Sequence, residues 1–145
     1  MTNSFVWTGI RPDVADISNG TDTPLLTLQR GPNFGVGPVY SIAAYADGTV
    51  VYSGIANVDI LSVQVSQTDP MVIAGIAQVA QISGYFDWQD SYDQHLVTDQ
   101  ATIITTIRRD DQYKRIARYD GDPNAPLGLV RIEDSIIRLV TDGDI

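Results

Sequence analysis

Two hairpin patterns, each followed by a helical pattern, constrain the fold of this chain more than any other feature of its sequence. The clearer hairpin turns at Asp47-Gly48, because this dipeptide tolerates the positive φ angles of a tight turn and β-branched and aromatic residues flank it. A second hairpin turns at Asp110-Asp111. Strands are predicted at residues 25–29, 39–45, 49–52, 58–65, 101–108 and 114–119, and helices at residues 71–83 and 127–140. This order predicts an α+β fold in which an antiparallel sheet of about five to six strands packs two helices on one face.

The length of the chain fits one compact domain. Its 145 residues are 43% hydrophobic, so one core can bury most of the surface that the unfolded chain exposes. Residues 1–24 mix glycine, proline, aspartate and asparagine without sustained periodicity, which predicts an irregular N-terminal arm. Residues 25–145 contain no linker and no repeat. We therefore expect a single α+β domain over residues 25–145.

The helix predicted at residues 71–83 carries no charge. Asp69 suits the N-cap and Pro70 the first helical position, and no charged residue occurs between Asp69 and Asp87. A surface helix normally has a solvated polar face. Two explanations stay open: the rest of the chain covers both sides of this helix, or one side meets another subunit in a homo-oligomer.

The chain is strongly acidic, with a formal net charge of -9. Residues 1–107 contain ten Asp against only Arg11 and Arg30, whereas the charges beyond residue 107 are mixed. This balance predicts no nucleic-acid partner, because affinity for a phosphate backbone comes from Lys and Arg. Solubility explains the acidity, and attraction to a basic partner or a cation is the sharper alternative.

Several absences limit the function classes. No apolar run reaches the roughly 18 residues needed to cross a bilayer, and no secretory signal pattern opens the sequence. We therefore expect no membrane association and a cytoplasmic location. The chain has no cysteine, which excludes a disulfide, a thiolate nucleophile and a cysteine-based zinc site. We expect no metal and no cofactor.

The segment 87–99 holds the densest set of reactive side chains. It contains His95, the only histidine, together with Asp99 and Tyr92. Imidazole, carboxylate and phenol groups can move protons near neutral pH if they converge on one pocket, so these three are the candidate catalytic residues. The alternative is a solvated His95 and an Asp99 that caps a turn. A triad with Ser91 lacks a nucleophile-elbow sequence.

Four aromatic residues are candidate ligand-binding residues: Tyr40, Tyr52, Tyr85 and Trp88. They could line a cavity beside the sheet, and packing in the core is the alternative explanation. A further segment, residues 120–124, spaces oxygen atoms as the start of a calcium loop does. Ala125 replaces the glycine expected next, and Arg131 stands where such a loop has its bidentate glutamate. A turn that leads into the second helix is therefore predicted there.

Several motifs resemble those of one protein family. They are Arg30-Gly31-Pro32-x-Phe34-Gly35, Pro38-Val39-Tyr40-Ser41, Asp47-Gly48-Thr49-Val50, Tyr52-x-Gly54, Tyr85-Phe86, Ser91-Tyr92 and, in the closing helix, Glu133-Asp134. Over residues 25–140 the chain resembles the bacterial domain of unknown function 6438. The resemblance implies one α+β domain and no particular activity. Members usually carry cysteines where this sequence has Asn33 and Gly37, so no bridge or metal clip forms in this loop.

Three functions follow as hypotheses. The first is a small acidic interaction or ligand-binding domain that takes a protein or small-molecule partner and self-associates through helix 71–83. The second is a cofactor-independent enzyme that acts on a small organic molecule by acid–base catalysis in an aromatic pocket. The third is an inhibitor or immunity-type protein whose negative field attracts a basic target. An enzyme needs a concave site with a perturbed titrating group, whereas an interaction module needs an exposed apolar or acidic patch.

Overall fold

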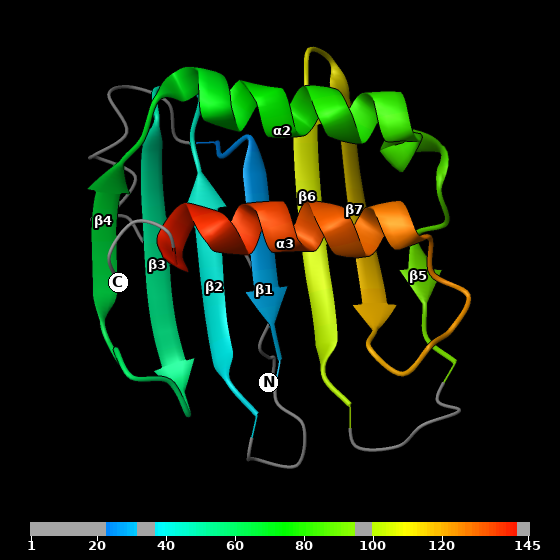
Figure 1. Cartoon of the computed structure of the whole chain (residues 1–145), viewed down its shortest axis with the longest axis horizontal. Coiled ribbons are helices and arrows are strands. Elements are labelled where there is room, and N and C mark those ends of the chain that lie inside the picture. The colour runs from blue at the N-terminus through cyan, green and yellow to red at the C-terminus, as the bar shows by residue number, and fades with distance from the viewer. Residues whose placement is uncertain (1–22, 32–36, 95–99, 142–145) are drawn as a thin grey trace.

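The structure of the protein is a computed structural model that describes residues 23–31, 37–94 and 100–141. Within these ranges one sheet carries both α-helices on the same side (Figure 1). The elements in chain order are β1 (Leu26–Arg30), β2 (Val39–Ala44), β3 (Thr49–Ala56), β4 (Val63–Gln67), α2 (Pro70–Ser83), the 3-10 helix η1 (Tyr85–Asp87), β5 (Ser91–Tyr92), β6 (Thr102–Arg109), β7 (Gln112–Tyr119) and α3 (Leu127–Thr141). The predicted α+β class is confirmed. Residues 1–22 of the predicted N-terminal arm lie outside the described residues.

The sheet has seven strands in the order β4-β3-β2-β1-β6-β7-β5. Neighbouring strands run antiparallel except β5, which pairs parallel to β7. The expectation of a purely antiparallel sheet of about five to six strands is therefore wrong in strand number and in direction. β5 is two residues long and lies in a polar segment, so it has no alternating apolar pattern. A hydrogen bond of 3.0 Å from the Ala117 N–H to the Asp90 carbonyl secures its start.

One face of the sheet forms the main core with the helices. Side chains alternate between the two faces along a strand, so Leu26 and Leu28 of β1 point to the same side. The largest completely buried apolar side chains of this core are Leu26, Leu28, Ile42, Ile73, Ile107, Ile116, Leu129 and Ile136. They come from β1, β2, β6, β7 and both helices, which joins the two hairpin units in one core.

Helix α2 begins and ends where the sequence predicts. The Asp69 carboxylate accepts a hydrogen bond of 2.9 Å from the Met71 N–H, and Gly84 ends the helix with a φ angle of 104°. The Thr68 N–H donates to the carbonyl of Gly48 at 2.8 Å, so the tip of the first hairpin holds the start of the helix. Three residues face the core: Ile73, Ala77 and Ala80.

Helix α3 lies across β1, β2 and β3 beside α2 (Figure 1). Four apolar residues of α3 are buried at helical spacing, Leu129, Ile132, Ile136 and Val140, and Leu139 is half-buried. No α-helix within the described ranges is long and apolar enough to cross a membrane.

The chain after β3 departs from the strand predicted at residues 58–65. β4 starts only at Val63, because residues 57–62 fold back against β3. A Cβ atom at Gly54 would lie 1.8 Å from the Ile60 carbonyl oxygen, so only glycine permits this approach. Asn57 turns the chain with a φ angle of 59°, and its amide donates to the Gly37 carbonyl at 3.0 Å. This loop forms one wall of a pocket.

Two isoleucines of α2 give a matched test of the core. Ile73 is completely buried and Ile82 is 77% exposed. Ile73→Ala should lower the free energy of unfolding by about 2–5 kcal/mol, because it removes buried methyl groups and leaves a cavity. Ile82→Ala should change it by less than about 0.5 kcal/mol. Urea unfolding followed by circular dichroism measures both, and equal losses would contradict this orientation of α2.

Candidate binding sites on the helical side of the sheet

Tyr92 is the one candidate catalytic residue that the structure describes. His95 and Asp99 lie outside the described residues, so the convergence of the three stays a prediction. Tyr92 lies on β5 and is buried. Its hydroxyl oxygen accepts a hydrogen bond of 3.1 Å from the Gln89 N–H. This bond ties the turn before β5 to the core.

Two of the four candidate ligand-binding residues, Tyr85 and Trp88, pack at the β7 side of the sheet. Their ring centroids are 5.9 Å apart. The Tyr85 hydroxyl is hydrogen-bonded to the Thr105 hydroxyl at 2.7 Å, and burial raises the pKa of this phenol. The Trp88 carbonyl accepts a hydrogen bond of 2.6 Å from Lys114 Nζ. Both rings fill space between η1, β7 and the start of α3, as core residues do.

The other two, Tyr40 and Tyr52, line a cavity at the far end of α3. Their ring centroids are 6.0 Å apart and the rings are tilted by 31°. We call this cavity of about 250 Å³ the tyrosine pocket. Its lining residues are Tyr40, Tyr52, Val58, Asp59, Ile60, Ile137, Val140 and Thr141. The structure thus separates the four predicted ligand-binding residues into a core pair and a pocket pair.

The walls of the tyrosine pocket are fixed by the fold. Tyr40 and Tyr52 stand on neighbouring strands β2 and β3. The Tyr52 hydroxyl donates to the Ile60 carbonyl at 3.3 Å, and the Gly54 N–H donates to the Ser62 carbonyl at 3.2 Å. These bonds hold the loop at 57–62 against β3. The pocket is therefore preformed, which favours a binding role for it.

Among the residues that the structure describes, Asp59 is the only one with a charged side chain that lines the tyrosine pocket. Burial and the Asp59 carboxylate both raise the pKa of Tyr52. Burial also raises the pKa of Tyr40, and Arg30, opposite Tyr40 on β1, opposes this rise. Both phenols therefore stay neutral hydrogen-bonding groups at physiological pH.

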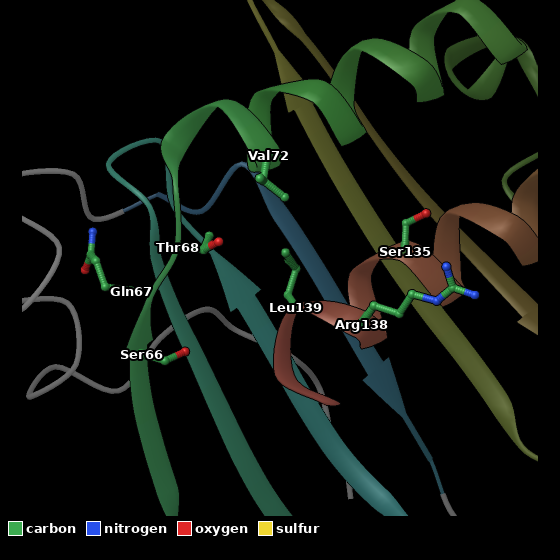
Figure 2. A pocket seen from close by; sticks show the side chains of 7 residues that line it. All are labelled: Ser66, Gln67, Thr68, Val72, Ser135, Arg138 and Leu139. Carbon is green, nitrogen blue, oxygen red and sulfur yellow. The ribbon is translucent and has the colours of Figure 1, made fainter. Parts of the chain in front are cut away.

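A second cavity, the Arg138 cleft, lies between β4, α2 and α3 (Figure 2). Its volume is about 290 Å³, and it is lined by Ser66, Gln67, Thr68, Val72, Ser135, Arg138 and Leu139. Val72 and Leu139 extend from the two helices toward each other, and Gln67 points away from α3 (Figure 2). Arg138 is exposed, so the cleft offers one solvated cation and several hydroxyl groups.

The outer side of α2 is exposed and apolar. Met71 is 78% exposed, Val79 57% and Ile82 77%, and Val72, at 47%, lies at the edge of this side next to the Arg138 cleft. Gly75 lies among them with open space around its Cα, and no charged residue occurs on the helix. Within residues 23–31, 37–94 and 100–141, the chain covers only the inner side of α2, which is the side that holds Ile73, Ala77 and Ala80. We call the exposed outer surface the α2 face.

A buried ion pair that the sequence did not suggest joins α3 to β7. Arg118 Nε and Nη2 donate to the two Glu133 carboxylate oxygens at 2.7 and 2.6 Å, and both side chains are buried. Arg118 Nη1 also donates to Asp120 at 2.9 Å. Burial raises the pKa of Glu133, and the Arg118 guanidinium opposes this rise. In the sequence, burial of Glu133 is indicated only by its position next to Ile132 and three residues before Ile136, both on the apolar side of α3.

Removal of one partner of this pair should be costly. Arg118→Met leaves the Glu133 carboxylate buried without its bidentate donor, and we expect a loss of about 3–5 kcal/mol of unfolding free energy. The double variant Arg118→Met/Glu133→Leu should recover most of this loss, because no uncompensated charge remains. Urea unfolding at neutral pH measures both variants. A cost below about 1 kcal/mol for the single variant would show that the pair is solvated.

Asp122, from the segment compared with a calcium loop, acts as a turn residue. Its two carboxylate oxygens accept hydrogen bonds from the Asn124 N–H at 2.8 Å and the Gln94 N–H at 3.0 Å. These bonds hold the pKa of Asp122 below its ordinary value. They also fix Gln94, which directly precedes His95 in the sequence. Within residues 23–31, 37–94 and 100–141, no group of three or more His, Asp or Glu is placed to hold a metal ion.

The lowered pKa of Asp122 predicts a pH-dependent contribution to stability. The contribution is present above the unfolded pKa of about 3.9 and is lost as the pH falls through the lower folded pKa. Asp122→Asn should therefore lower Tm at pH 7, and its difference from the wild type should shrink below about pH 4. Asp111→Asn, on the exposed β6–β7 turn, is the matched control and should leave Tm unchanged. A difference that persists at low pH would contradict the role of the carboxylate.

The comparison with known families agrees with this structure. The profile of a family described as "Domain of unknown function (DUF6438)" matches residues 24–140, which is most of the chain. The match spans every described strand and all but the last residue of α3. No curated protein matches the sequence significantly. The chain belongs to the DUF6438 family.

Proposed function

We propose that this protein is an interaction domain that pairs with a second copy of itself through the α2 face. The observation that carries the proposal is the exposure of Met71, Val72, Val79 and Ile82 on a helix without a charged residue. Contiguous exposed apolar surface of this kind is typical of contact sites between proteins. The α2 face supports self-pairing for two further reasons, its symmetry and its charge.

The order of residues along α2 is suited to antiparallel self-pairing. Met71 and Val72 lie at one end of the α2 face, Val79 and Ile82 lie at the other, and the small residue Gly75 lies between them. A two-fold axis near the middle of the helix would set each apolar end against the opposite apolar end of the second copy. The small central residue allows the two helix backbones to approach closely.

The charges next to the α2 face also fit a second copy. The chain as a whole carries a formal net charge of -9, which disfavours contact between most parts of its surface. Helix α2 carries no charged residue, so this repulsion does not apply to the α2 face. Asp69 lies at its N-terminal end, and Arg109 contacts Gln81 near its C-terminal end. Antiparallel pairing would bring Asp69 of one copy toward Arg109 of the other.

A charge placed on the α2 face should disrupt the dimer. Val79→Glu places one unpaired carboxylate from each copy in the apolar contact, and we expect dimerisation to weaken roughly tenfold or more, equivalent to about 1.4 kcal/mol. Sedimentation equilibrium over a range of protein concentrations measures the effect. Leu127→Glu is the matched control, because Leu127 is 64% exposed but lies on α3. A wild-type chain that stays monomeric at every concentration would refute the proposal.

The absence of cysteine permits a second readout of the same proposal. A Cβ atom at Gly75 meets nothing within 4 Å, so Gly75→Cys fits the monomer. Mild oxidation should link two copies of Gly75→Cys through the two-fold axis, and Leu127→Cys should not be linked at the same protein concentration. A dimer in which Gly75→Cys is not linked would contradict the antiparallel arrangement.

The other functions stay predictions from the sequence. The acid–base enzyme depends on His95 and Asp99, which lie outside the described residues. The inhibitor or immunity-type role depends on the negative field of residues 1–107, and binding to a basic target that weakens steeply with added salt would support it. A cytoplasmic location and the lack of a nucleic-acid partner likewise stay predictions.

A further inference from the structure

We propose that the tyrosine pocket binds a small organic ammonium ion that has an apolar body. This inference concerns a different surface from the α2 face and does not depend on dimerisation. It stands on three observations about the described residues: the apolar lining of the pocket, the rings of Tyr40 and Tyr52, and the Asp59 carboxylate. Each observation determines one part of the ligand.

The lining determines the body of the ligand. Val58, Ile60, Ile137 and Val140 supply aliphatic walls, so a polar molecule would lose hydration in the pocket without regaining hydrogen bonds. The volume of about 250 Å³ suits a molecule the size of one aromatic ring with a short chain. Tyr40 and Tyr52 offer ring faces beside such a body.

The carboxylate determines the charge of the ligand. Within the described part of the chain, ion pairs join Lys114 to Asp90 and Arg118 to Asp120 and Glu133, and no ion pair involves Asp59. Asp59 is exposed beside the Tyr52 ring, so a cation in the pocket gains both the carboxylate and the aromatic face.

Other charges near the pocket do not reverse this preference. Arg30, Glu133 and Asp134 act on Tyr40 electrostatically. The charge of Glu133 is compensated by its ion pair with Arg118. The opposite charges of Arg30 and Asp134 then offset each other in their effect on Tyr40. Among the described residues, the remaining charge near the pocket is that of Asp59, and the formal net charge of -9 adds a general attraction for cations.

Three ligands of similar shape and different charge test the proposal on the full chain. The probes are phenethylammonium, neutral 2-phenylethanol and anionic 3-phenylpropionate, titrated at low ionic strength and followed by ¹H–¹⁵N NMR. We expect affinity in the order ammonium, alcohol, carboxylate, with about a threefold step between ammonium and alcohol as exposed ion pairs give. Amide shifts should concentrate at residues 57–62 and at the end of α3.

Two variants separate the charge from the cavity. Asp59→Asn should lose most of the preference for phenethylammonium over 2-phenylethanol and keep only the part that the overall negative charge supplies, whereas Asp111→Asn, which makes the same charge change on the β6–β7 turn, should keep the full preference. Val58→Phe, which fills the pocket from its loop wall, should weaken both ligands. Equal affinity of the wild type for ammonium and alcohol, failure of all three probes to bind, or a preference in Asp59→Asn as large as in Asp111→Asn would each overturn the proposal.

Discussion

The large apolar side chains on one face of the sheet can leave water only if both helices cover that face. This constraint decides most of the architecture. Side chains on a strand alternate between the two faces, and the pairing registers of β1, β2, β6 and β7 place their large apolar side chains on the same face. Leu28, Ile42 and Ile116 consequently meet residues of α2 or α3 in one core. A helix on the opposite face would leave this core in solvent.

The same constraint creates the sites. Since α3 must lie across β1, β2 and β3, its end reaches the loop after β3, and the gap left there is the tyrosine pocket. Its middle carries Glu133 into the core, where a bidentate bond to Arg118 compensates the buried charge. Because α2 needs only one side to cover the sheet, Met71, Val79 and Ile82 on its other side are exposed.

The ends of α2 and the turn of the first hairpin were predicted from the sequence, because capping and turn residues mark them locally. Strand β5 and the start of β4 have no such residues and were not predicted. Asp69 and Gly84 set the ends of α2 through capping that acts within a few residues, and the Asp47-Gly48 turn does the same for the first hairpin. β5 and the late start of β4 depend instead on pairing with distant strands. The apolar neighbours of Glu133 on α3 could indicate its burial, but they could not identify its partner, because Arg118 lies 15 residues away on β7. The sequence selects Tyr40, Tyr52, Tyr85 and Trp88 as one set, and only the packing separates the pair that lines the tyrosine pocket from the pair in the core.

The sequence by itself determined the α+β class, both helices, both hairpins and the uncharged character of α2, because periodicity, capping and turn chemistry are local properties. The tertiary structure decided which side of α2 is exposed, which aromatic residues enclose a cavity and which charged residues are buried. These outcomes depend on contacts between elements far apart in the chain, and a local pattern carries no information about them. The open α2 face and the carboxylate at the tyrosine pocket, on which both proposals rest, belong to this second group.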